Sequence, residues 1–143
     1  MSVQPRSGSL LGSALIAGII GGVLVDAFLS LSHHISPITL WSGMAAAAAG
    51  PGSPWWLGLL VHAVISLVWA VLYAYVVSAI GQLRNWLVSG IVWGVIVTAV
   101  MAFIVSTKTG STWSSNFQED LLGTAVFYAL PMAFYLARAT RRA

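Results

Sequence analysis

The chain has 143 residues, of which 59% are hydrophobic and 6% are charged, and its net charge is +3. The mean hydropathy of +0.92 lies outside the range of soluble domains and indicates an integral membrane protein. The sequence contains no cysteine, which excludes disulfides, thiolate metal sites and thiol nucleophiles. Its six basic residues are scattered at the ends of apolar stretches, so we expect the lipid bilayer, and no nucleic acid, as a partner.

Four apolar stretches are long enough to cross a membrane as helices, which takes about 20 residues. They cover residues 10–32, 55–80, 86–106 and 121–138. These stretches lack the polar alternation of barrel strands, and isolated strands cannot satisfy their backbone groups in lipid. The sequence therefore predicts one all-α domain over residues 1–143, a polytopic membrane four-helix bundle. Pro131 predicts a kink in the last span.

The segment between the first two spans is predicted to hold a short helix at residues 38–49. Pro37 suits a first helical position, and Gly50 and Pro51 end the helix. Because this helix is too short to cross a membrane, we expect it at the membrane interface. Nearby indole rings would then form an aromatic belt at the lipid headgroups, with an aromatic cage for a cation as the alternative. The tryptophans concerned are Trp41, Trp55, Trp56 and Trp113.

Basic residues beside the spans predict the orientation of the protein, because cytoplasmic flanks are enriched in Lys and Arg. Lys108 stands on the side of the membrane opposite to the arginines, next to Glu119 and Asp120. The sequence therefore predicts a multi-pass protein of the bacterial inner membrane with both termini in the cytoplasm. The arginines on the predicted cytoplasmic side are Arg6, Arg84, Arg138, Arg141 and Arg142.

Glycines recur at four-residue spacing in two of the spans. Gly18 and Gly22 lie in the first span, and Gly90 and Gly94 lie in the third. Such GxxxG pairs let helix backbones approach closely in lipid, where packing must supply the association. We expect these glycines to pack helices within one chain, with a dimer face as the alternative.

A carboxylate lies inside the first span, where an unpaired charge would be costly. Asp26 is about 9 Å from the end of its helix, and His62 is about 10 Å from the start of the next, antiparallel helix. The equal depths predict that Asp26 and His62 form an intramembrane polar pair. Ser30, His33 and His34 are a possible extension of this cluster.

The chemistry of the pair has several interpretations at this point. It could be a structural hydrogen bond between two helices, or a proton-responsive site, because histidine titrates near neutral pH. A metal or haem site is a third possibility, although no ligand pair with the spacing HxxxH supports it. No catalytic constellation or phosphate-binding loop is recognisable, so the sequence predicts neither an enzyme nor a cofactor.

Several runs resemble a family of small, uncharacterised four-helix membrane proteins of bacteria. These runs are GGVLVDAF at 21–28, SPITLWSGMAAAAAG at 36–50, GLLVHAVISLVWAVLYAY at 58–75 and GIVWG at 90–94. More distantly, the chain is similar to YagU-type inner-membrane proteins, which are linked in a general way to acid tolerance. The resemblance covers roughly residues 18–104 and implies the fold and topology, but no established activity. After the third span the chain reads IVSTKTG, where the family often has a Pro-Leu-Ser turn.

Two classes of function fit these observations. A free-standing, non-enzymatic envelope protein linked to pH or stress should contain a polar cavity between its helices. An accessory subunit of a larger membrane complex should have little internal cavity and an outer helix face rich in Trp and small residues. Other membrane proteins, or further copies of the chain in a homo-oligomer, are the possible protein partners.

Overall fold

A computed structural model describes residues 7–83, 85–109 and 117–141 of the chain, and the side chains of residues 10–83, 85–108 and 117–141. Over the described ranges every regular element is a helix, and no strand occurs. Four of the helical segments are long and apolar enough to cross a membrane. The prediction of an all-α four-helix bundle is therefore confirmed.

The first four helices lie close to their predicted ranges. They are α1 (Ser7–Ser32), α2 (Pro37–Ala49), α3 (Trp55–Ala79) and α4 (Trp86–Thr109). The Ser36 hydroxyl caps α2 by accepting a hydrogen bond from the backbone N–H of Thr39, and Pro37 occupies the first turn. The short helix between the first two spans is thus stabilised at its start by residues of its own segment.

The last span is longer than predicted and is built from three consecutive elements. These are α5 (Phe117–Leu122), a π-helical segment η1 (Gly123–Ala129) and α6 (Leu130–Arg141). Acidic residues in its first turn and arginines in its last turn stabilise the two ends through the helix dipole, which extends the helix beyond the apolar stretch.

The π-helical segment lies directly before Pro131. The backbone N–H of Leu130 bonds to the carbonyl of Ala125, five residues earlier. Proline has no N–H to donate and its ring crowds the carbonyl four residues back, so a wider turn relieves the contact. The irregularity predicted at Pro131 is thus a stretch of wider helix that precedes the proline.

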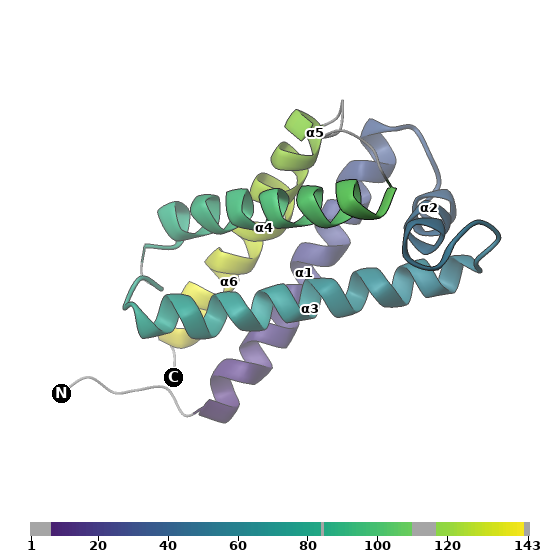
Figure 1. Cartoon of the computed structure of the whole chain (residues 1–143). Helices are drawn as coiled ribbons and strands as arrows, with labels where there is room; N and C mark the ends of the chain where they lie inside the picture. The colour runs from purple at the N-terminus through teal and green to yellow at the C-terminus, as the bar shows by residue number, and fades with distance from the viewer. Residues whose placement is uncertain (1–6, 84, 110–116, 142–143) are drawn as a thin grey trace.

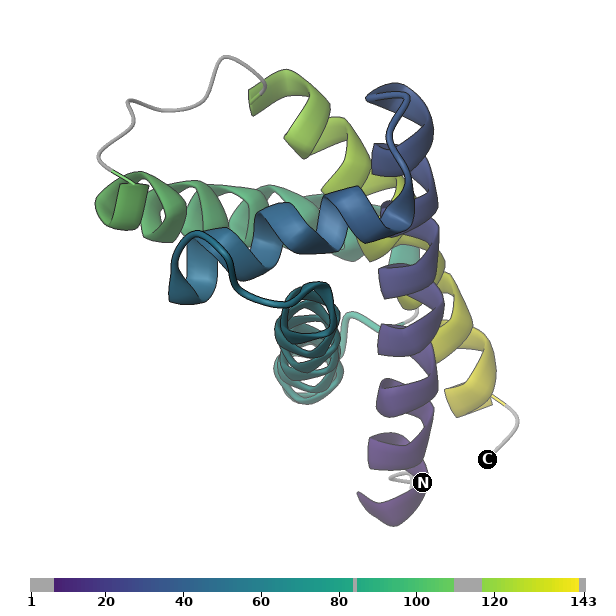
Figure 2. The same cartoon turned by 90° about the vertical axis from the view of Figure 1, so that its right-hand side faces the viewer.

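The helices cross one another obliquely, and the two ends of the bundle differ (Figure 1). The start of α1 and the end of α6 lie at one end, together with the link between α3 and α4, whereas α2 lies at the other end. α2 packs along the first part of α3 and touches α1 and α4, as the turned view shows (Figure 2). α1 packs on α3 and on the last span, and α4 packs on the last span. The backbones of α3 and α4 lie close at few positions, and the two helices meet mainly through the rings of Trp69 and Tyr73 on α3 and Trp93 on α4.

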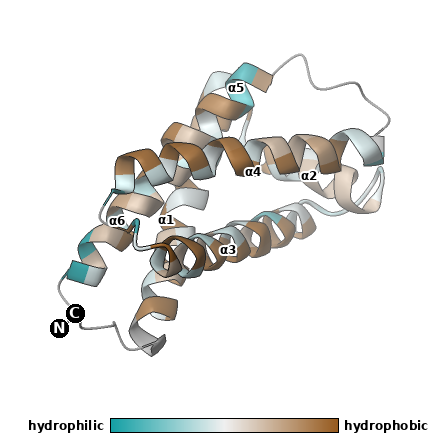
Figure 3. Ribbon diagram, turned by 60° about the vertical axis from the view of Figure 1, so that its left-hand side comes forward, coloured by the Kyte–Doolittle hydropathy of each residue, from teal (hydrophilic) through white to brown (hydrophobic). Residues whose placement is uncertain are grey.

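The buried core lies mostly in the half of the bundle that holds the end of α6. Its largest fully buried side chains are Tyr73, Met132 and Leu136. The Tyr73 hydroxyl is 2.8 Å from the Ser89 hydroxyl, which links α3 to the start of α4. Elsewhere the helix surfaces are largely apolar, and hydrophilic residues gather at the start of α5 and the end of α6 (Figure 3). This distribution suits a protein surrounded by lipid along its length and by water at its ends.

Both GxxxG pairs lie at close contacts within the chain. A Cβ atom at Gly18 would be 2.9 Å from the Cβ of Ala70 on α3, and one at Gly94 would be 2.5 Å from the Cα of Ala125 on η1. Gly90 similarly faces Ala133 on α6. The first pair therefore brings α1 against α3, and the second brings α4 against the last span.

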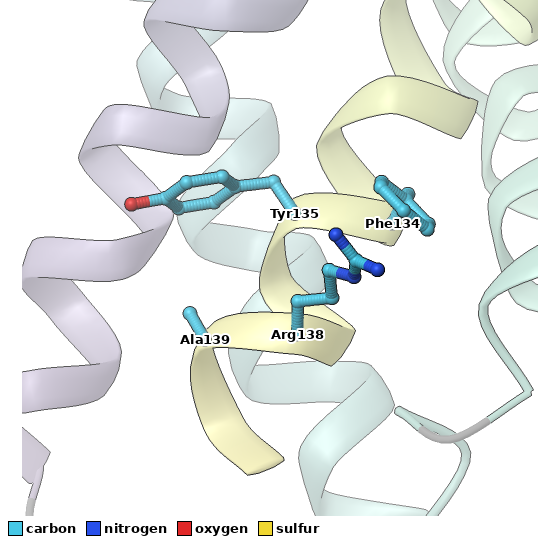
Figure 4. Close-up of a pocket in the computed structure, with 4 residues that line it drawn as sticks. All are labelled: Phe134, Tyr135, Arg138 and Ala139. Atoms are coloured by element: carbon cyan, nitrogen blue, oxygen red, sulfur yellow. The ribbon is translucent and has the colours of Figure 1, made fainter. Parts of the chain in front are cut away.

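The arginines of α6 lie at the end of the bundle where α1 starts. The Arg138 guanidinium is 4.9 Å from the centre of the Phe134 ring, a cation–π distance. Figure 4 shows these two side chains beside each other and Tyr135 directed away from them, around a surface hollow of about 300 Å³. Some residues used to predict the orientation or the aromatic belt lie outside the described residues, namely Arg6, Arg84, Trp113 and Arg142.

Candidate functional site

Asp26 lies where three helices meet. Its Oδ1 atom is 3.1 Å from Nε2 of His62 on α3. Its Oδ2 atom accepts a hydrogen bond of 3.0 Å from the indole N–H of Trp41 on α2. The Asp26 and His62 side chains are only 13% and 18% exposed. The structure thus brings the two residues of the expected pair together and adds a third, which we call the Asp26 cluster (Asp26, Trp41 and His62).

A glycine makes this approach possible. Gly22 precedes Asp26 by one helical turn and so shares its face of α1. A Cβ atom at Gly22 would be 3.1 Å from the Ser66 hydroxyl and 3.8 Å from His62 Nε2. Without a side chain at this position, α3 comes near enough for His62 to reach the carboxylate.

The matching face of α3 is a stripe of mostly small residues at four-residue spacing. At its start, Gly58 lies so close to α2 that an added Cβ would collide with the carbonyl of Trp41. Further along, Ser66 and Ala70 receive Gly22 and Gly18 of α1. This four-residue spacing is visible in the sequence, but the stripe contains only one glycine, so the GxxxG pattern does not reveal it. The stripe consists of Gly58, His62, Ser66, Ala70 and Ala74.

Trp41 makes a contact that the belt interpretation did not include, and its place in the belt stays a prediction. Its indole N–H donates to the buried carboxylate, and its ring stacks on Trp55 with 5.9 Å between the ring centres. The side chain is drawn inward because the close contact at Gly58 places α2 against α3 at the depth of Asp26. Trp55 and Trp56 are 42% and 54% exposed at the start of α3, and for them the belt stays a prediction.

The possible extension of the cluster lies elsewhere. His33 Nε2 is 3.6 Å from Glu119 Oε1, and both side chains are about one-third exposed. His34 is an exposed residue with a φ of 54°, at the point where the chain leaves α1. His33 is two helical turns, about 10 Å, beyond Asp26, and it pairs with the last span instead. Ser30 is buried, and its hydroxyl has no hydrogen-bond partner among the described residues.

The contacts of His62 allow more than one protonation state. Its Nε2 atom lies between the Asp26 carboxylate and the Ser66 hydroxyl, which is 3.4 Å away. Oδ1 of Asp26 is fully buried and receives no hydrogen bond of regular geometry in the described part of the chain, so its contact with His62 is close without being an aligned hydrogen bond. A protonated His62 ring would balance the negative charge of the carboxylate. With a neutral ring, the hydrogen bond from Trp41 would be the main interaction that stabilises that charge.

A cavity of about 440 Å³ adjoins the cluster, and His62 and Ser66 form part of its wall. This volume lies within the range of binding pockets for small molecules, about 300–1,000 Å³. Most of the wall is aliphatic, and Lys108 and Asp120 lie at one end. The remaining lining residues are Val25, Leu29, Met44, Ala47, Ala48, Val61, Ile65, Trp69, Val97, Thr98, Met101, Ala102, Ile104, Val105, Ser106, Thr124 and Tyr128.

The metal or haem interpretation receives no support from the described residues, which contain no group of three His, Cys, Asp or Glu side chains able to hold a metal ion. The Asp26–His62 and His33–Glu119 contacts are two separate pairs. Comparison of the chain with protein-family models, curated proteins and solved structures found no match.

Proposed function

We propose that this multi-pass membrane protein is a free-standing, non-enzymatic protein of the bacterial inner membrane whose Asp26 cluster responds to protons. The observation that carries the proposal is that His62 contacts the buried carboxylate of Asp26 and also lines the cavity. An accessory subunit should have little cavity, so the volume of about 440 Å³ supports the free-standing protein by its size, although the wall is mostly aliphatic where a polar cavity was expected.

The response would pass from His62 to α2. Histidine is the side chain that ordinarily changes charge between about pH 5 and 8. A change in the charge on His62 alters how strongly the carboxylate holds the Trp41 N–H, and Trp41 ties α2 to α1. Titratable groups that face His62 directly or across the cavity also contribute to its field: Asp26 on α1, Lys108 on α4, Asp120 on α5 and Tyr128 on η1.

Nuclear magnetic resonance of labelled protein in lipid nanodiscs tests this coupling. In the variant H33N/H34N, His62 is the one remaining histidine, because the chain contains three. The His62 ring signals and the Trp41 indole N–H signal should change with pH along the same curve, since both groups contact one carboxylate. In the same background, Asp26→Asn should uncouple the two signals. A His62 signal that stays constant between about pH 5 and 8 would refute the proton response.

The proposed orientation has its own test. If both termini are cytoplasmic, alkaline phosphatase fused after Ala143 should be inactive, because this reporter folds only outside the cytoplasm. The same reporter inserted between residues 50 and 54 should be active. The opposite pair of results would reverse the orientation without affecting the Asp26 cluster.

A further inference from the structure

We propose that the cavity holds one acyl chain of a phospholipid whose phosphate is bound by Lys108. The cavity lies along segments apolar enough to cross a membrane, and most of its lining comes from α3 and α4, with further residues from α1, α2 and the last span. Ile104 and Val105 line it and are also exposed, so it opens on the surface of α4. A lipid chain can therefore enter from the side, within the bilayer.

The chemistry of the wall favours a hydrocarbon chain over water or a polar ligand. Three hydroxyls of the wall donate within the protein: Thr98 to the Gly94 carbonyl at 2.8 Å, Ser106 to the Phe103 carbonyl at 2.9 Å, and Tyr128 to the Ser66 carbonyl at 2.5 Å. A buried water needs two to four polar partners, and a wall of aliphatic side chains and engaged hydroxyls offers few. An acyl chain loses no hydrogen bonds in such a space.

The length and polarity of the cavity fit a lipid of the membrane leaflet that surrounds the α2 end of the bundle. Along α4 the lining runs from Lys108 to Val97, about 16 Å at 1.5 Å per residue. Lys108 lies in the last turn of α4, where a membrane-spanning helix reaches the headgroups. A lysine at this height complements the phosphate of the lipid, while the acyl chain of the lipid extends toward the middle of the membrane.

Photolabelling tests the proposal with a defined probe, phosphatidylethanolamine that carries a diazirine within one acyl chain, in nanodiscs with the full-length protein. The label should attach to the cavity-lining parts of α3 and α4. Ala102→Phe, which fills the cavity, should cause a several-fold loss of this labelling. Val100→Phe is the matched control, because Val100 lies on the same helix, is 37% exposed and does not line the cavity.

A second variant pair tests the headgroup and does not depend on filling the cavity. Lys108→Gln should reduce labelling of the cavity several-fold, whereas Arg138→Gln, which removes a cation at the opposite end of the bundle, should leave it unchanged. Labelling that spreads evenly over exposed faces of the spans, or that survives Ala102→Phe or Lys108→Gln, would overturn the proposal. Neither pair replaces a residue of the Asp26 cluster, and lipid labelling is a different readout from the His62 and Trp41 signals. Ala102→Phe leaves every charge near His62 in place, so its outcome is separate from that of the proton response.

Discussion

Replacing Gly58 by leucine is expected to detach α2 from α3 and to lower the stability of the protein. A Cβ atom at this position collides with the backbone carbonyl of Trp41, which a change of rotamer cannot relieve. Overpacking of this kind usually costs about 1–3 kcal/mol, and a backbone collision belongs at the upper end. The free energy of unfolding in mixed micelles measures the loss, and the Trp41 indole N–H signal reports whether α2 has moved.

Gly43→Ala is the matched control for Gly58→Leu. Gly43 lies in α2 itself, and a Cβ atom there would meet nothing within 4 Å. Alanine in place of an unconstrained helical glycine should stabilise the protein by about 0.5–1 kcal/mol. If Gly58→Leu were as stable as the wild type with an unchanged Trp41 signal, the close approach of α2 and α3 would not exist in the membrane.

Asp26→Leu should have the second large effect, because it removes the acceptor shared by two other helices. The Trp41 N–H and the His62 ring would then lie in an apolar setting without their partner, which costs about 1–3 kcal/mol in total. Thermal or denaturant unfolding in lipid or mild detergent measures this loss.

Asp26→Asn separates the role of hydrogen bonding from that of charge. The amide oxygen can accept a hydrogen bond from Trp41, and the amide N–H₂ can donate one to a neutral His62. The free energy of unfolding of this variant should therefore be close to that of the wild type. Trp41→Phe removes one of the two contacts of the carboxylate, so its free energy of unfolding should lie between those of Asp26→Asn and Asp26→Leu. Equal stability of Asp26→Leu and Asp26→Asn would mean that the cluster contributes nothing to the fold.

The two halves of the bundle serve different purposes in this interpretation. Close packing around Tyr73, Met132 and Leu136 holds α1, α3 and α6 together at the end where α1 starts. At the end that carries α2, α2 packs closely on α3 at Gly58, and the Asp26 cluster and the adjacent cavity add polar contacts and free space. Polar contacts between a few side chains can change with protonation or ligand, whereas a packed apolar core cannot do so without unfolding. We therefore expect changes of conformation at the α2 end.

Local patterns in the sequence determined much of the fold. Apolar stretches of spanning length predicted the four long helices, and Pro37 with Gly50 predicted the bounds of α2, because helix formation in lipid and helix termini depend on neighbouring residues. The meeting of Asp26 and His62 also followed from counting, since two antiparallel helices joined near one membrane surface place residues of equal depth side by side.

Tertiary structure decided what counting along helices could not. Trp41 reaches Asp26 only because the chain folds back after Ser32 and α2 then packs on Gly58, and no spacing in the sequence specifies that turn. His33 lies on the Asp26 face of α1 by periodicity, yet it pairs with Glu119 because the last span passes the end of α1. The cavity lies beside the ends of α3 and α4 that are nearer to α2, because glycines attach α1 to α3 and α4 to the last span, while the contacts between α3 and α4 gather around Trp93. Such a space is a property of how all the helices pack together, and no single segment encodes it.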